Sequence, residues 1–128
     1  MSQLDAICRE VIEKSEWVAI ATTGADGPHL AACWTRNVLP LSADGDEILI
    51  PAWRFETTEE NLKCDPRIEL LFVARDVKRA EGDSQGCTIF GTGELLTTGS
   101  KADAIKVRFP WARGVLVVKV NDTKTHLP

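Results

Sequence analysis

The sequence predicts a mainly β fold, a small barrel of six antiparallel strands with short flanking helices. Six segments rich in β-branched and apolar residues are separated by clusters of Gly, Pro and Asp. Short connections with Asp-Gly turn chemistry join the first three segments, as is typical of antiparallel neighbours. Closure into a barrel removes the unpaired edges that an open sheet would expose.

Size and charge limit the class of protein. The 128 residues fit one domain over residues 1–128, and 44% hydrophobic with 27% charged residues is ordinary for a globular chain. The formal charge of −4 argues against a general nucleic-acid or anionic-membrane partner. No apolar run has the length of a membrane span and no signal-like segment opens the chain, so we expect a cytoplasmic protein.

The first half of the chain predicts one helix and three strands. The helix covers residues 3–15, whose apolar side chains recur on one face: Leu4, Ile7, Cys8, Val11 and Ile12. The strands are predicted at 17–23, 29–41 and 47–53. The turns GADGP and SADGD connect them, so we expect the three strands to form an antiparallel meander.

The second half predicts two more helices and three more strands. Residues 57–66 form a short helix that opens with a capping box of Thr57 and Glu60. In the fifth strand, Gly91 and Gly93 are expected to permit a bend or a bulge. The remaining elements are a strand at 67–75, an exposed hairpin loop at 76–86, a strand at 87–98, a helix at 101–109, a strand at 113–121 and a tail at 122–128.

The cysteines and histidines do not form a recognisable catalytic or metal-binding motif. The four cysteines lack CxxC pairs and Cys/His ligand spacing, so we expect no metal site, and reduced thiols that act as small apolar fillers: Cys8, Cys33, Cys64 and Cys87. His29 follows a turn and His126 lies in the tail. Neither has a partner that would suggest a catalytic triad, and we assign no catalytic residue.

One candidate anion site lies at the start of the second helix. The segment RFETTEEN places Arg54, Thr57 and Thr58 at a helix N-terminus, where free N–H groups and the helix dipole attract anions. Two hydroxyls and a guanidinium there could hold a phosphate. From spacing alone a plain capping box, with Arg54 as a solvated surface charge, is the better interpretation.

A second cluster interrupts the strand HLAACWTRNVLPL. Trp34, Thr35, Arg36 and Asn37 stand in a row, and Arg36 is expected mid-strand on the same side as Trp34. Arg36 could reach a phosphate or pair with an acid on a neighbouring strand, and the sequence leaves both open. The tryptophans, among them Trp34, Trp53 and Trp111, suit either packing or a flat aromatic ligand.

Four stretches together resemble the FMN-binding split β-barrels, the pyridoxamine-5'-phosphate-oxidase-like flavoproteins, and most closely their small FMN-binding members. They are WVAIATTGADGPHLAACWT, ILIPAW, TTEENLKCDPRIELL and FPWARGVLVVKV. The match runs from about Glu16 to Leu127, and the order and spacing of the stretches carry it.

The resemblance implies a homodimeric split barrel with one FMN per subunit near the interface. The phosphate would sit against the 35–37 segment, comprising Thr35, Arg36 and Asn37, and against the helix start at Thr57 and Thr58. Trp34 and Trp111 would line the flavin, Glu16 would approach the partner's flavin, and Leu127 would lie near the ring. Relatives carry a lysine in place of Thr57 and an aromatic residue near Asn37. We expect Arg36 or Arg54 to replace the lysine.

The function that follows is a small redox protein passing electrons through FMN to an unknown redox partner. The absence of a candidate acid–base pair argues against a demanding substrate reaction. One alternative is an FMN-dependent oxidase or reductase of a small molecule, which needs a second pocket with basic side chains. Another is a split barrel that binds haem, with His29 or His126 as ligand, or a deazaflavin. A purely structural dimeric barrel is the last.

Overall fold

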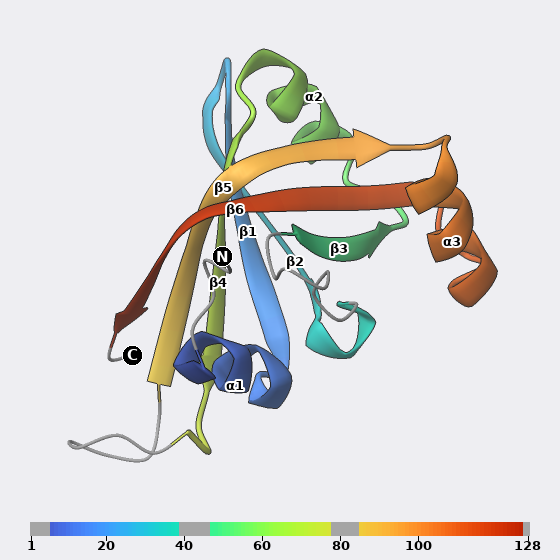
Figure 1. Ribbon diagram of the computed structural model, residues 1–128. Coiled ribbons are helices and arrows are strands. Elements are labelled where there is room, and N and C mark those ends of the chain that lie inside the picture. Colours follow the sequence, from blue (N-terminus) through green and yellow to red (C-terminus); the bar gives the residue numbers. More distant parts are fainter. Residues whose placement is uncertain (1–5, 39–46, 78–84, 127–128) are drawn as a thin grey trace.

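The computed structural model describes residues 6–38, 47–77 and 85–126 (Figure 1). Leu127 and the predicted SADGD turn lie outside these residues. The elements are α1 (Ala6–Lys14), β1 (Trp17–Gly24), β2 (Gly27–Trp34), the 3₁₀ turn η1 (Thr35–Asn37), β3 (Glu47–Ala52), α2 (Glu56–Cys64), β4 (Arg67–Ala74), β5 (Gln85–Leu96), α3 (Ser100–Arg108) and β6 (Gly114–His126).

The predicted mainly β architecture is confirmed. Six strands form one sheet in the order β2-β1-β4-β5-β6-β3, and every neighbouring pair is antiparallel. Figure 1 shows the sheet curling on itself, with β5 and β6 as long bent strands that span the molecule. Helix α1 lies at one end of the curl and α2 at the other.

The predicted meander of the first three strands is wrong. Only β1 and β2 form a hairpin, closed by a tight turn in which Gly27 takes a φ of 103°. β3 pairs with β6 instead, from Glu47 opposite Lys119 to Ala52 opposite Gly114. In a meander the chain would turn back after β2 and pair with it. Here the chain instead leaves β2 through η1. The apolar β3 then pairs with an equally apolar stretch of β6.

Two strand ends also differ from the prediction. The second strand ends at Trp34, seven residues before the predicted end at 41, because residues 35–37 turn out of the sheet. The last strand continues to His126, through the segment predicted as a tail. There β6 pairs with β5 as far as Gly86 opposite His126. β5 provides backbone hydrogen-bond partners along this stretch. They keep residues 122–126 in the strand, although its sequence is polar.

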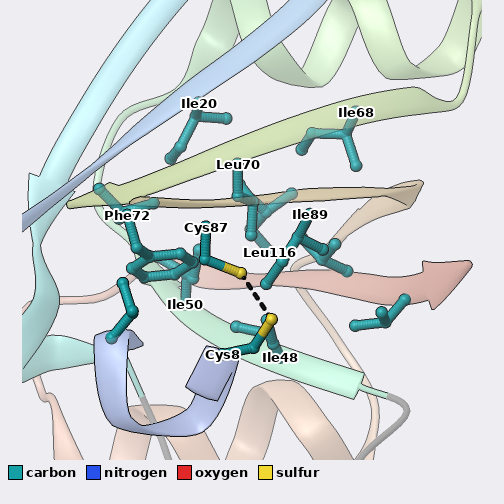
Figure 2. Packing of buried hydrophobic residues seen from close by; sticks show 14 of the residues in the cluster. Cys8, Ile20, Ile48, Ile50, Ile68, Leu70, Phe72, Cys87, Ile89 and Leu116 are labelled. Atoms are coloured by element: carbon teal, nitrogen blue, oxygen red, sulfur yellow. Dashed lines mark hydrogen bonds between the residues drawn. The ribbon is translucent and has the colours of Figure 1, made fainter. Parts of the chain in front are cut away.

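The main core fills the concave side of the curled sheet (Figure 2). Alternate residues of the strands point into it, as the period of two in WVAIATT and RIELLFVA predicts. Its largest fully buried side chains are Phe72, Ile20, Ile48, Ile50, Ile68, Leu70, Ile89, Ile105, Leu116, Val11, Val18 and Val77, of which Ile105 belongs to a smaller cluster under α3.

The predicted irregularity in the fifth strand is confirmed. The register of β5 against β6 shifts between Phe90 and Gly91. A Cβ atom at Gly91 would overlap the carbonyl oxygen of Lys119 in the neighbouring strand. A glycine here therefore permits the close approach of two backbones, which is the usual reason for glycine at a bulge.

Replacing Gly91 with alanine is expected to lower the free energy of unfolding by about 1–3 kcal/mol, because one backbone must move away from the other. Urea unfolding measures the loss. Gly93→Ala is the matched control, since its Cβ would meet side-chain carbons of Ile68 and Leu62 at 3.2 Å, and these side chains can shift. Equal destabilisation by the two substitutions would contradict the assignment of the close approach to Gly91.

Candidate functional site

The predicted site residues fall into two groups in the structure. The first, called the η1 group here, comprises Glu16, Trp34, Thr35, Arg36 and Asn37. The expectation that Arg36 lies mid-strand is wrong, because residues 35–37 form a 3₁₀ turn after β2 ends. The backbone N–H of Thr35 donates to the carbonyl oxygen of Glu16 over 3.1 Å, which joins this turn to the start of β1.

Side chains of the η1 group divide into buried and exposed members. Thr35 is buried, and its hydroxyl is hydrogen-bonded to that of Ser15 over 3.1 Å, so it anchors the turn. Arg36 is exposed, with its guanidinium carbon 5.9 Å from the centre of the Trp34 ring. Glu16 forms an exposed ion pair with Arg75 at 3.5 Å. This group offers an aromatic surface with the exposed Arg36 cation beside it.

Trp17 is a member of this region that the sequence analysis passed over. It lies directly opposite Trp34 in the β1–β2 pairing, and the two side chains are 52% and 56% exposed. The alternation in WVAIATT was the available signal, because it puts Trp17 on the face opposite the buried Val18 and Ile20. An exposed tryptophan pair on a sheet surface is unusual for a monomer.

Both tryptophans belong to a larger apolar surface, which we call the outer face. It lies on the convex side of β2, β1 and β4, where the register aligns Ala19 with Ala32 and with Leu71. The Leu30 side chain is 74% exposed. The members of the outer face are Trp17, Ala19, Ala21, Leu30, Ala32, Trp34, Leu71 and Val73.

The second group surrounds the N-terminus of α2. The predicted capping box does not form: the helix begins at Glu56, its N-cap is Phe55, and no side chain caps it. Thr57 therefore lies inside the first turn and is exposed. The first N–H that donates within the helix is that of Glu59, to the Phe55 carbonyl oxygen at 2.8 Å. The N–H groups of Glu56, Thr57 and Thr58 come before this bond and therefore have no acceptor within the helix.

Thr58 is the distinctive residue of this helix start. It is fully buried, and its Oγ1 is a buried side-chain oxygen that lacks a hydrogen-bond partner within the part of the chain described. Leaving a buried hydroxyl unpaired costs about 1–3 kcal/mol. Such a group at an uncapped helix N-terminus fits a site whose missing partner is an anion.

Arg113 organises the turn that leads into α2. Its Nε and Nη2 donate to the carbonyl oxygen of Arg54 over 2.9 and 2.7 Å. Its Nη2 also donates to Glu59 over 3.0 Å. These bonds hold the turn at Phe55. The backbone φ of Phe55 is 64°, a value that residues other than glycine rarely adopt. In the sequence this arginine stands out only as part of the stretch FPWARGVLVVKV, and nothing local signals a contact 59 residues away.

Aromatic side chains surround the same helix start. Trp53 and Trp111 are both exposed, and they follow β3 and precede β6, whose ends pair at Ala52 and Gly114. The Arg54 guanidinium lies 4.9 Å from the centre of the Trp53 ring. Trp111 packs against Phe109, with ring centres 5.6 Å apart.

The second group is called the α2 group here. It combines the N–H groups of the first helical turn, an unpaired hydroxyl, cations and aromatic rings. Its side chains are those of Trp53, Arg54, Thr57, Thr58, Trp111 and Arg113.

The structure does not bring the two groups together. Thr35 is bonded to Glu16 at the first end of β1, whereas Asn61 of α2 donates to Thr22 near the other end. The six residue steps from Glu16 to Thr22 span about 20 Å. Figure 1 likewise shows η1 and α2 at opposite ends of the β1–β2 hairpin. The two groups therefore contact β1 at different points along its length.

A substrate-converting enzyme would need a further pocket with basic side chains, and a hollow among the described residues can be examined for that role. A hollow of about 300 Å³ near the tip of the β1–β2 hairpin is lined by Thr23, Pro28, Arg67 and Glu69, among others. Its cation is already engaged: Arg67 forms a bidentate pair with Asp65 at 2.7–3.2 Å and lowers the pKa of that carboxyl to about 2. In the described ranges, no cluster of His, Cys, Asp or Glu could hold a metal ion.

Comparisons with known proteins confirm the resemblance inferred from the sequence. Residues 4–125 match the family described as Pyridoxamine 5'-phosphate oxidase. A protein of Nitratidesulfovibrio vulgaris (strain DSM 19637 / Miyazaki F) named FMN-binding protein is 38% identical over 111 residues, which cover 87% of this chain and 88% of that protein.

Solved structures support the fold. HupZ of Group A Streptococcus has a TM-score of 0.75 at 20% identity, covering 94% of this chain and 91% of that one. HutZ, described as a heme storage protein of Vibrio cholerae, has a TM-score of 0.58 at 12% identity, covering 99% and 95%. At such identities the likeness concerns the fold alone. The family match over residues 4–125, together with the 38% identical relative, shows that the chain belongs to the pyridoxamine 5'-phosphate oxidase family.

Proposed function

We propose that this protein binds FMN as a homodimer and acts as a small redox protein that exchanges electrons with a partner protein. The observation that carries FMN binding is the unpaired, fully buried hydroxyl of Thr58 at the uncapped start of α2. The 38% identical relative, named FMN-binding protein, supports the same ligand. Bound FMN would supply one- or two-electron chemistry, and the protein would set its affinity and potential.

The α2 group fits a phosphate by charge as well as by hydrogen bonding. The N–H groups of the first turn and the Thr58 hydroxyl are donors that await an acceptor. The first turn also carries Glu56 and Glu59, which would repel an anion. Arg113 offsets Glu59 through their ion pair, and Arg54 adds a second positive charge at the same turn. We infer that Arg54, and not Arg36, takes the place of the family lysine.

The outer face supports the homodimer. Its centre is apolar, and its border carries charged side chains such as Glu69 and the Arg75–Glu16 pair. An apolar centre with a polar rim is the usual anatomy of a protein interface. A second copy of this chain is the proposed occupant, because a twofold pairing would bury Trp17, Trp34 and Leu30 on both subunits at once. The η1 group would then border the interface, and Trp34 and Glu16 would face the partner's ligand.

A redox carrier suits the side chains better than an oxidase or reductase of a small molecule. Neither group contains a pair of titratable side chains placed for acid–base work, and the hollow beside Arg67 has no uncommitted cation. A cytoplasmic location is part of the proposal, and no described helix is long and apolar enough to cross a membrane.

A visible absorption spectrum tests the proposal most directly. The purified protein is mixed with FMN, freed of excess ligand by gel filtration, and compared with samples treated with riboflavin or haem. Retained flavin bands with FMN, and weaker retention of riboflavin, are expected. Retention of haem alone, with a red-brown colour, would replace the proposal with the haem alternative. A protein that retains none of the three ligands would contradict the proposal and favour the purely structural barrel.

Replacing Arg113 with alanine is expected to raise the dissociation constant for FMN about five- to tenfold and that for riboflavin less than twofold. The Arg54 carbonyl would lose both donors, and Glu59 would be left uncompensated beside the phosphate. Fluorescence titration measures both constants. Lys124→Ala, which removes an exposed cation on β6, is the matched control. An equal rise in the dissociation constants for FMN and riboflavin would restrict Arg113 to a role in folding.

Replacing Glu16 with glutamine is expected to raise the reduction potential of the bound flavin by a few tens of millivolts. A carboxylate ~10 Å from a group that gains one negative charge raises its energy by about 1.7 kcal/mol at an effective dielectric constant of 20, or about 70 mV. Pairing of Glu16 with Arg75 weakens this effect. Equilibration with redox dyes measures the potential, with Glu13→Gln on α1 as control. An unchanged or lower potential would remove Glu16 from the site.

A further inference from the structure

Two of the four cysteines face each other in the core, although 79 positions separate them in the sequence. Cys8 lies on α1 and Cys87 on β5, and both side chains are fully buried. The Cys87 thiol donates to the Cys8 sulfur, with the two Sγ atoms 2.9 Å apart. Figure 2 shows the two sulfur atoms pointing toward one another, surrounded by Phe72, Ile48, Ile50, Ile89 and Leu116.

This separation is closer than packing requires. Non-bonded carbon atoms in a core settle at about 3.5–4.0 Å, whereas a disulfide bond is about 2.05 Å long. The two sulfurs at 2.9 Å need to approach by only about a further 0.9 Å to bond. The other two cysteines differ: Cys64 is exposed, and burial raises the pKa of the half-buried Cys33 thiol to about 11. The interpretation of all four cysteines as passive fillers therefore does not account for this pair.

We propose that Cys8 and Cys87 form an oxidisable pair, a site of reversible disulfide formation within the barrel. The oxidant is a peroxide, small enough to reach the pair when α1 opens locally. Peroxide oxidises one thiol to a sulfenic acid and releases one water. The second thiol attacks that sulfur, the S–S bond forms and a second water leaves. Two thiols and one hydrogen peroxide thus give one disulfide and two waters, and a dithiol reductant reverses the change.

The disulfide would fasten the first helix to the sheet. The bond joins residues 79 positions apart, so it closes a long loop of the unfolded chain. After α1 ends at Lys14, the chain runs through Ser15, whose hydroxyl is bonded to that of Thr35, to Glu16 and Trp17. Oxidation therefore restrains the helix that leads directly into the η1 group. This inference rests on the cysteine geometry and is independent of FMN binding.

The test treats the purified protein with hydrogen peroxide and maps its cysteines by mass spectrometry of a non-reduced digest. We expect a cross-linked Cys8–Cys87 peptide, 2 Da lighter than the sum of the two peptides, that disappears with dithiothreitol. We also expect the melting temperature to rise by about 5 °C or more on oxidation. Cys8→Ala and Cys87→Ala should each abolish both effects, whereas the double variant Cys33→Ala, Cys64→Ala should keep them.

Two outcomes would overturn the proposal. In the first, Cys8 and Cys87 keep free thiols, counted in denaturant, under conditions that fully oxidise the exposed Cys64. In the second, Cys8 or Cys87 is found joined to Cys33 or Cys64, or is oxidised to a sulfinic acid. If the alanine variants fail to fold, the peptide map of the wild-type protein still decides between these outcomes.

Discussion

The Thr58→Val variant is expected to bind FMN about 10- to 100-fold more weakly than the wild-type protein while folding at least as stably. A hydrogen bond from a hydroxyl to a charged acceptor is worth about 1.5–3 kcal/mol, which corresponds to this loss. In the ligand-free protein the same hydroxyl is fully buried and unpaired. Valine has nearly the same shape and helix propensity, so removing the hydroxyl should raise the free energy of unfolding by about 1 kcal/mol.

The opposite signs of these two effects make the test specific. Isothermal titration gives the FMN affinity, and urea unfolding of the ligand-free protein gives the stability. Thr125→Val, the same chemical change at an exposed position on β6, should alter neither quantity. Riboflavin, which lacks the phosphate, should bind wild type and Thr58→Val alike. A variant that loses stability and retains FMN affinity would show that Thr58 contributes to packing and not to a ligand site.

The pattern of side-chain alternation predicted what each strand buries but not which strand it pairs with. WVAIATT and RIELLFVA gave β1 and β4 almost to the residue, because a period of two reflects one buried face. The same pattern says nothing about partners. β3 lies beside β6 because two apolar strands distant in the sequence match, and the polar end of β6 is a strand because β5 extends alongside it. Pairing of this kind depends on tertiary contacts.

The candidate site was predictable in its residue types and not in its geometry. The TTEEN segment correctly indicated a helix start, yet the capping box required the helix to begin after Thr57, and it begins at Glu56. In the observed helix Thr58 is fully buried and its hydroxyl is unpaired, which the predicted cap at Thr57 did not indicate. Arg113 could not be found from local pattern, because its role depends on a contact with the carbonyl of Arg54. The exposed Trp17 became visible only through its register opposite Trp34.

Substituting Trp17 with glutamate is expected to convert a dimer of this chain into a monomer, the largest effect we predict. The wild-type protein should sediment at twice the 14.1 kDa of one chain, and the variant at 14.1 kDa. Trp17 lies at the aromatic end of the outer face, opposite Trp34, so a second copy would bury both rings. An unpaired carboxylate buried there costs several kcal/mol, enough to raise the dissociation constant of the dimer at least a thousandfold.

The control for this variant is Val107→Glu, which adds the same charge at an 84% exposed apolar side chain on α3. It should remain dimeric, since α3 packs beside β6 and away from the outer face. If Trp17→Glu stays dimeric, the interface lies elsewhere, and the exposed tryptophans must be covered by another partner.

Measuring FMN binding by both Trp17→Glu and Thr58→Val separates the proposed ligand site from the proposed dimer. Loss of FMN binding in the monomeric Trp17→Glu variant would mean that the η1 group works across the interface, whereas retained binding would confine the ligand to the α2 group of one chain.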